Sequence, residues 1–407
     1  MGEVIEGGEW PALLDVTSLL ADGWRPTPFQ EFIVKIHARC DLLCDYCYVY
    51  QMADQGWREQ PRRMSKVVID QLAARIAEHA VSHELDSVKI VLHGGEPLLA
   101  GVDRLRYAVE GIRETVRDIT ETSTRVDFGI QTNAVTLGPE HLALFDELDV
   151  SIGVSMDGGA LAHDRHRRHA DGRGSYAEVA SALRQLVRAP YRRLFSGLLC
   201  TIDLANDPIE TYESLLRWHP PAVDFLLPHG NWDAPPPGRP PGGTETPYAD
   251  WLIALFEHWY TAPVEKTSIL IFREILDLLL GGASRSEAIG LSPVAVLVIE
   301  TDGSIEQSDI LKSAYPGATH TGFSLAHNTF DEVLTLPHFV ARQLGVGALS
   351  NACSACSVRM ICGGGQYAHR YRAGSGFANP SVYCPDLLRL IQHIRARMKS
   401  DIQHVRC

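Results

Sequence analysis

Six short apolar runs alternate with longer stretches of helical periodicity between residues 29 and 230, and this alternation constrains the fold more than any other feature. The runs are FIVKIHA, SVKIVLHGG, RVDFGIQTN, DVSIGVSMDG, LFSGLLCTI and VDFLLPHG. Segments between them, such as VVIDQLAARIAEHA, place apolar residues three and four positions apart, as helices that pack on a sheet do. Strands joined by such crossover helices pair in parallel. The pattern predicts an α/β fold built on a partial (β/α)6 TIM-like barrel.

Changes of composition along the chain divide it into four predicted parts. Residues 1–28 are an N-terminal extension that is too short to fold alone or to hold a leader-binding domain, and residues 29–232 are the partial barrel. Residues 233–290 begin with DAPPPGRPPGGTETP, which cannot sustain a helix or a central strand, and continue with linker helices. Residues 291–407 are a smaller domain that begins with a hairpin at the Asp302-Gly303 turn and ends in a C-terminal helix.

The overall charge and hydropathy exclude several classes of partner. The chain has 37 Lys and Arg against 50 Asp and Glu, a net charge of -13 that disfavours nucleic acid. No run approaches the roughly 20 apolar residues of a membrane helix. The N-terminus also lacks the basic start and apolar stretch of a signal peptide. We therefore expect no membrane partner and a cytoplasmic location.

Seven of the nine cysteines fall into two groups. Thiols stay reduced in the cytoplasm, so grouped cysteines there indicate metal rather than disulfides. The first group, Cys40-x3-Cys44-x2-Cys47, directly follows the first apolar run. Three thiolates therefore meet on a loop at the C-terminal end of a strand, where barrels of this kind carry their chemistry. A zinc loop completed by His37 or by a distant side chain is the alternative.

The first group and the aromatic segment YCYVYQ around it resemble the radical S-adenosylmethionine (SAM) superfamily. The resemblance implies a [4Fe-4S] cluster on Cys40, Cys44 and Cys47, with SAM bound at the fourth iron. It also implies an electron donor such as flavodoxin or ferredoxin. In this family one electron from the cluster cleaves SAM to a 5'-deoxyadenosyl radical, which abstracts hydrogen from the substrate.

Motifs at the later strand ends are similar to the cofactor-binding motifs of that family, in the same order along the chain. Tyr46 matches a position against the adenine, and the Gly94-Gly95-Glu96 motif matches one that receives the methionine amino group. Gln131 with Asn133, and Ser155 with Asp157, match positions near the ribose and carboxylate of the cofactor. Arg167 matches a position that faces the carboxylate.

The second cysteine group is Cys353-x2-Cys356-x5-Cys362 with Cys384 further along. Four thiolates suffice for one [4Fe-4S] cluster and equally for a structural zinc. The spacing resembles the SPASM (twitch-like) domain of peptide-modifying radical enzymes, which holds auxiliary Fe-S clusters.

Two cysteines of the full SPASM pattern are missing. One position is Gln366, and the other falls in the triplet Gln307-Ser308-Asp309. Both departures remove ligands of the same cluster, so we expect one auxiliary [4Fe-4S] cluster. Asp309 matches a carboxylate that acts as a base in relatives, and a solvated turn aspartate is the alternative reading.

From about residue 28 to 395 the chain resembles the FxsB-type radical SAM/SPASM peptide maturases. Stretches that carry the likeness include FIVKIHARCDLLCDYCYVYQMADQGWR and CGGGQYAHRYRAGSGFANPSVYCPDL. The resemblance implies that a precursor peptide is the substrate and that an aromatic side chain is joined to the β-carbon of a nearby residue, forming a three-residue cyclophane. Asp309 would take the proton and the auxiliary cluster the electron.

Other activities remain open at this point. Thioether formation and oxidation of Ser or Cys to formylglycine use similar domains, although enzymes of the latter type normally keep both auxiliary clusters. Outside radical chemistry, the chain could be a zinc-stabilised peptide-binding protein. Four other polar residues near strand ends or the linker helices are expected to have supporting roles. They are His93, His229, Arg273 and Glu274.

Overall fold

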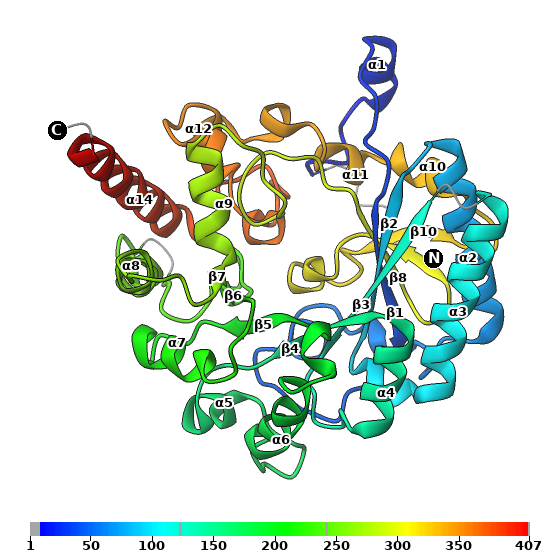
Figure 1. Cartoon of the computed structure of the whole chain (residues 1–407). Helices are drawn as coiled ribbons and strands as arrows, with labels where there is room; N and C mark the ends of the chain where they lie inside the picture. The colour runs from blue at the N-terminus through cyan, green and yellow to red at the C-terminus, as the bar shows by residue number, and fades with distance from the viewer. Residues whose placement is uncertain (1–8, 122–123, 241–242, 406–407) are drawn as a thin grey trace.

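The computed structural model describes residues 9–121, 124–240 and 243–405 (Figure 1). Residues 1–8 of the predicted extension and residues 241–242 of the Pro/Gly-rich stretch lie outside this range. The centre of the protein is a ten-stranded sheet in the order β10-β9-β8-β1-β2-β3-β4-β5-β6-β7. The strands are β1 Glu31–His37, β2 Ser87–Gly94, β3 Arg125–Thr132, β4 Val150–Ser155, β5 Phe195–Thr201, β6 Ala222–Leu226, β7 Ser268–Ile269, β8 Val296–Ile299, β9 Ser304–Glu306 and β10 His320–Ser324.

Strands β1 to β6 are the six predicted apolar runs, and they pair in parallel in chain order. The helices between them lie on the outer side of the curved sheet (Figure 1). The predicted α/β fold with a partial barrel is confirmed. These helices are α2 Lys66–Ser82, α3 Val102–Ile119, α4 Pro139–Leu148, α5 Ala160–His166, α6 Tyr176–Leu186 and α7 Pro208–Leu216.

Local sequence explains why these helices begin where they do and which face they bury. The Ser65 hydroxyl accepts a hydrogen bond from the Val68 amide at the start of α2, and Asp207 does the same for two amides at the start of α7. In α3 the buried side chains recur at three and four positions, as a helix against a sheet requires. They are Leu105, Ala108, Val109, Ile112 and Val116.

The later part of the chain extends the same sheet. Strand β8 pairs in parallel with β1, and β9 and β10 follow as antiparallel strands after the predicted turn at Asp302-Gly303. The predicted domain boundary at residue 291 therefore falls just before a strand that continues the barrel sheet, and it stays a prediction. The segment SILIFREILDLLLGG contains one of the predicted linker helices, and the short strand β7 precedes this helix.

The linker helices and the C-terminal helix pack together at one side of the barrel. Helices α8 (Pro247–Tyr260) and α9 (Leu270–Leu279) contact α14 (Cys384–Val405). Leu390, Ile391 and Ile394 of α14 belong to the same continuous hydrophobic core as the barrel strands. Four short α-helices lie between β10 and α14 in the described part of the chain. They are α10 Phe330–Leu334, α11 Pro337–Ala341, α12 Asn351–Ser354 and α13 Arg359–Cys362.

Two glycines let the loop after β2 lie directly against the loop after β1. The Gly95 amide donates to the His37 carbonyl at 2.8 Å, and the next amide donates to the Arg39 carbonyl at 2.9 Å. A Cβ atom on Gly95 would overlap the Tyr50 hydroxyl and the Arg39 backbone, and one on Gly94 would overlap the His37 carbonyl. The Gly94-Gly95 pair therefore fixes the cysteine-bearing loop to its neighbour.

Replacement of Gly95 by Ala should therefore destabilise the protein by about 2–4 kcal/mol, because backbone atoms cannot move aside as a flexible side chain can. The matched control is Gly111→Ala in α3, where an added Cβ meets no atom within 4 Å. This change should stabilise the helix by about 0.5–1 kcal/mol. Urea denaturation of both variants measures the difference. Equal stability of the two variants would contradict the close approach of the loops.

Candidate active site

The three cysteines of the first group lie on the loop that follows β1, at the C-terminal end of the parallel strands. Burial raises the pKa of the Cys44 thiol to about 11, and Arg167 is the cation that opposes the shift. Burial likewise raises the pKa of Cys40 and Cys47. Because a bound metal requires thiolates, such thiols lose their protons when a cation such as iron binds them. The loop therefore fits a metal cluster.

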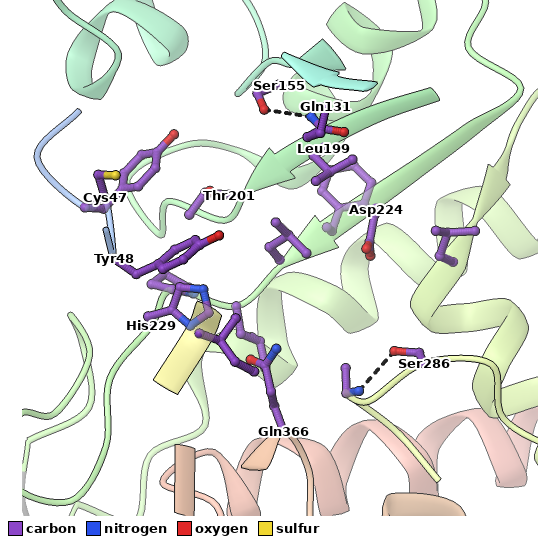
Figure 2. A pocket seen from close by; sticks show the side chains of 18 of the residues that line it. Cys47, Tyr48, Gln131, Ser155, Leu199, Thr201, Asp224, His229, Ser286 and Gln366 are labelled. Carbon is purple, nitrogen blue, oxygen red and sulfur yellow. Dashed lines mark hydrogen bonds between the residues drawn. The ribbon is translucent and has the colours of Figure 1, made fainter. Parts of the chain in front are cut away.

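The loop forms one wall of a cavity of about 760 Å³ at this end of the sheet. Figure 2 shows side chains from the cysteine loop, from β3 to β6 and from the C-terminal part turned toward the same space. Ten of the predicted site residues line the cavity. They are Cys40, Cys44, Tyr46, Cys47, Gly94, Gly95, Gln131, Asn133, Ser155 and Arg167. Glu96, Asp157 and Asp309 are not among the residues that line it.

Asp157 holds two of the lining side chains from behind. One of its oxygens accepts hydrogen bonds from the Tyr46 hydroxyl and from Arg167 Nε at 2.9 Å, and the other accepts from the Thr201 amide at 3.0 Å. The Arg167 guanidinium also lies 5.5 Å from the centre of the Tyr46 ring. The predicted adenine and carboxylate contacts, Tyr46 and Arg167, are thus one connected unit.

Gln131 and Ser155 form a second unit across β3 and β4. The Gln131 amide donates to the Ser155 hydroxyl at 2.9 Å, and both side chains line the cavity (Figure 2). Gly153 leaves room for this contact, because a Cβ there would overlap the Gln131 side-chain oxygen. The two polar groups thus stand side by side, as the predicted ribose contacts would.

Asn133 and Glu96 connect the cysteine loop to the end of β3. Asn133 donates to Asp41 at 2.8 Å and contacts the Cys40 sulfur at 3.6 Å. The fully buried Glu96 carboxylate accepts from the Asn133 amide, the Leu98 amide and the Thr132 hydroxyl, all at 2.8–2.9 Å. Burial raises the pKa of Glu96 to about 7. Both carboxylate oxygens are satisfied by the protein, so Glu96 orders the strand ends rather than facing the cavity.

The second cysteine group gathers between the short helices and the start of α14. Cys353 is buried, and Cys356, Cys362 and Cys384 are partly buried. Burial raises the pKa of Cys362 to about 12, and the thiols of Cys384 and Cys353 raise it further. The Arg370 guanidinium donates to the carbonyls of Gly363 and Gly365 beside them. The four predicted ligands are therefore neighbours, and none of them lines the cavity.

Asp309, the predicted base, belongs to a buried ion cluster of Lys35, Glu300, Glu306, Asp309 and Lys312. The Lys35 ammonium pairs with Asp309 and lies 3.4 Å from Nδ1 of the cavity-lining His93. Burial alone would raise the pKa of Asp309, but Lys35 and Lys312 outweigh burial and lower it. The structure thus places Asp309 behind Lys35 and His93.

The same ion cluster contains one carboxylate more than it has cations. Lys312 contacts Glu300 at 2.7 Å and Glu306 at 3.2 Å, and oxygens of all three carboxylates lie within 4.8 Å of one another. Burial raises the pKa of Glu306 to about 7, and the charges of Glu300 and Asp309 add to the shift. Glu306 is therefore the member that keeps a proton up to neutral pH.

Several cavity residues were not identified as site residues from the sequence. Asp224 of β6 lines the cavity, and burial raises its pKa to about 6. A charge inside the apolar run VDFLL was the available signal for it. Gln366 and His369 line the cavity from the C-terminal part. The four residues expected to have supporting roles also line it, and they are His93, His229, Arg273 and Glu274. No local pattern marks His369, because only the tertiary fold brings its segment to the barrel.

Comparison with known proteins identifies the class. Residues 34–216 match the model of the Radical SAM superfamily. The cysteine-type anaerobic sulfatase-maturating enzyme of Clostridium novyi is 25% identical over 276 residues, which are 67% of this chain and 71% of the relative. The serine-type enzyme of Bacteroides thetaiotaomicron is 24% identical over 400 residues, 91% of this chain and 90% of the relative.

Solved structures agree on the fold. Native anSMEcpe with bound AdoMet superposes with a TM-score of 0.78 at 19% identity, covering 91% of this chain and 98% of that one. Streptococcus suis SuiB bound to its precursor peptide SuiA gives 0.56 at 12% identity, covering 90% and 78%. In the described part of the chain no helix is long and apolar enough to cross a membrane.

The strand-end cysteines and the open parallel sheet define a radical SAM fold, which agrees with the family match and with the solved structures. Residues 34–216 thus match the Radical SAM superfamily, and the proteins similar to this chain include anaerobic sulfatase-maturating enzymes. The predicted cofactors, SAM and a [4Fe-4S] cluster, are confirmed. The additional cysteine group is consistent with an auxiliary cluster.

Replacement of Asp157 by Asn tests how the cavity wall is held. The Arg167 side chain is 11% exposed and that of Asp157 only 2%, so Arg167 would keep a buried charge without its counterion. We expect a loss of about 3 kcal/mol in stability and weaker SAM binding, measured by urea denaturation and equilibrium dialysis. The control is Asp127→Asn, which breaks an exposed pair with Arg125 and should cost under about 0.5 kcal/mol. Similar losses in both variants would refute the role of Asp157.

Replacement of Glu306 by Gln tests the surplus carboxylate. Its pKa is about 7 in the folded protein against an ordinary value of 4.5, so wild-type stability should fall as pH rises from 4.5 through 7. The variant cannot lose a proton at this position, so its free energy of unfolding should fall less between pH 5 and pH 8 than that of wild type. The difference should be on the order of 2–3 kcal/mol. Denaturation at four pH values measures it. The half-buried Glu110→Gln in α3 is the control, and matching pH profiles for Glu306→Gln and wild type would contradict the assignment.

Proposed function

We propose that the chain is a radical SAM enzyme that modifies a precursor peptide and joins an aromatic side chain to the β-carbon of a nearby residue, forming a three-residue cyclophane. The observation that carries the proposal is the position of Gln366 in the cavity wall. The SPASM pattern has a cysteine there, and a glutamine amide cannot replace a thiolate as a cluster ligand. In the proposal this end of the cavity receives substrate instead of a first auxiliary cluster.

Peptide substrates of similar proteins support the proposal. One solved relative is anSMEcpe with AdoMet and the Cp18Cys peptide, and another is SuiB with its precursor peptide SuiA. A cavity of about 760 Å³ lies within the range of pockets that enclose a small ligand together with a substrate side chain. We therefore assign this chain a peptide substrate, part of which enters the cavity.

When bound, the cofactors supply a 5'-deoxyadenosyl radical that abstracts hydrogen from the substrate. The residues of the chain bind the cofactor and confine the radical. Tyr46, Arg167, Gln131 and Ser155 hold the cofactor end of the cavity. Leucine and phenylalanine side chains of β5, β6 and the following loop exclude water from the other walls, which protects a carbon radical. They are Leu199, Phe225, Leu226 and Leu227.

Formation of the new bond leaves an excess proton and an excess electron on the substrate. In the proposal the auxiliary cluster accepts the electron, and Asp309 remains the proposed final acceptor of the proton. Asp309 is paired with Lys35 and does not line the cavity, whereas His93, whose Nδ1 lies 3.4 Å from the Lys35 ammonium, does line it.

Oxidation of a Ser or Cys side chain is a second candidate. It is favoured by the relatives named cysteine-type and serine-type anaerobic sulfatase-maturating enzymes. The two reactions leave different products. A crosslink resists fragmentation between the joined residues, whereas the oxidised side chain carries an aldehyde that reacts with a hydrazide.

The test uses anaerobically reconstituted enzyme with SAM, dithionite and a synthetic library of peptides that carry an aromatic residue two positions from a variable residue. We expect production of 5'-deoxyadenosine and a peptide that loses two hydrogens without reacting with a hydrazide, both measured by mass spectrometry. The variant Cys40→Ala/Cys44→Ala/Cys47→Ala should form neither product. Cys200→Ala, a change at a buried cysteine of β5 outside both groups, is the matched control and should keep activity.

Other outcomes point elsewhere. A hydrazide-reactive product would favour side-chain oxidation over the crosslink. Formation of 5'-deoxyadenosine with no change in any peptide would argue against a peptide substrate of this kind. No 5'-deoxyadenosine, together with zinc in both cysteine groups, would leave a zinc-stabilised binding protein.

A further inference from the structure

One wall of the cavity carries two histidines, each with a ring nitrogen that has no hydrogen-bond partner within the described part of the chain. His369 is 2% exposed, yet its Nε2 makes no hydrogen bond there. Nδ1 of His229 is buried and equally without a partner among the described residues. Both residues line the cavity together with Tyr48 and Gln366. Buried polar atoms in folded proteins are nearly always satisfied, so unpaired atoms of two residues that line a cavity indicate a ligand.

The rings are close together and firmly held. The ring centres of His229 and His369 are 5.7 Å apart, and the Tyr48 ring packs edge-on against His229 at 4.8 Å. Tyr383 fixes both histidines from behind. Its hydroxyl donates to the Pro228 carbonyl at 2.6 Å, and its ring lies 5.0 Å from that of His369. Figure 2 shows Tyr48 next to Cys47, with His229 beside Tyr48 and Gln366 on the other side of His229.

The charge of this wall restricts what it can bind. Burial lowers the pKa of His229 to about 4. The pKa of His369 is lowered further, first by burial and then by His229 and Arg370. Among the described residues no carboxylate pairs with either ring, so both imidazoles are neutral at physiological pH. A neutral imidazole donates one hydrogen bond and accepts one, and it offers no counterion to a carboxylate or an ammonium group.

We propose that His229, His369 and Gln366 form a binding subsite for an uncharged amide of the substrate. An amide supplies one acceptor and at least one donor on a planar frame, which matches two neutral rings and a glutamine side chain. That this amide belongs to a peptide rests on the proposed function. Since Tyr48 directly follows Cys47, the subsite holds the amide next to the cysteine loop and so orients the residue that loses hydrogen.

The test needs no peptide substrate. Crystals of the reconstituted holoenzyme are soaked separately with N-methylacetamide, acetamide, acetate and methylammonium. N-methylacetamide represents the main-chain amide and acetamide the side chain of Asn or Gln. We expect one of the two amides within hydrogen-bond distance of His229 Nδ1 and His369 Nε2. The one that binds more tightly identifies the source of the amide, and neither ion should bind.

Variants show whether the two histidines cause the binding. His369→Leu should weaken amide binding roughly tenfold, the effect of one lost hydrogen bond to a buried group. His229→Leu provides a second variant if the first does not fold. His141→Leu is the matched control, because His141 also has a buried, unpaired Nε2 but lies on α4 away from the cavity. It should leave binding unchanged.

The outcomes separate this inference from the proposed function. Absence of both amides, binding of acetate or methylammonium at the same place, or full amide binding in both leucine variants would each overturn the subsite. Amide binding at the histidines with no modified peptide in the library would uphold the subsite and refute the peptide reaction. Modified library peptides without amide binding would do the reverse.

Discussion

Strand β1 is the element on which both halves of the protein depend. It pairs in parallel with β2 on one side and with β8 on the other, so that Phe32 lies opposite Ile90 and Leu297. The cysteine loop at its end is thereby fixed between the barrel and the C-terminal part. The ion pair between Lys35 in this strand and Asp309 closes the same contact with buried charge. Any shift of β1 would displace the cluster ligands and both cavity walls together.

The carboxylates of the barrel motifs act mainly as supports. Asp157 orients Tyr46 and Arg167, and Glu96 orders the end of β3 next to Asn133. The groups that line the cavity are therefore held by groups that do not line it. Such support allows a cofactor to bind without rearrangement, which lowers the cost of reaching a reactive geometry. It also explains why the Gly94-Gly95-Glu96 motif contains two residues that line the cavity and one, Glu96, that does not.

Local sequence patterns were sufficient for the barrel but not for the long-range contacts. The six strands and the turn at Asp302-Gly303 follow from periodicity and turn chemistry. The parallel pairing of β8 with β1 joins segments about 265 positions apart and leaves no local trace. Lys35 and Asp224 could have been singled out, since each is a charge within an apolar run. His369 could not, because its place in the cavity depends on how the C-terminal part packs.

The ends of the sheet have a consequence for substrate size. Strands β7 and β10 are the two edges of the sheet, and they do not close it into a full barrel. A closed barrel admits only molecules that fit through its mouth, whereas an open one can admit a short stretch of a long polymer while the remainder stays in solvent. The length of a substrate is therefore not limited by the volume of the cavity. Selectivity must come instead from the few residues that enter.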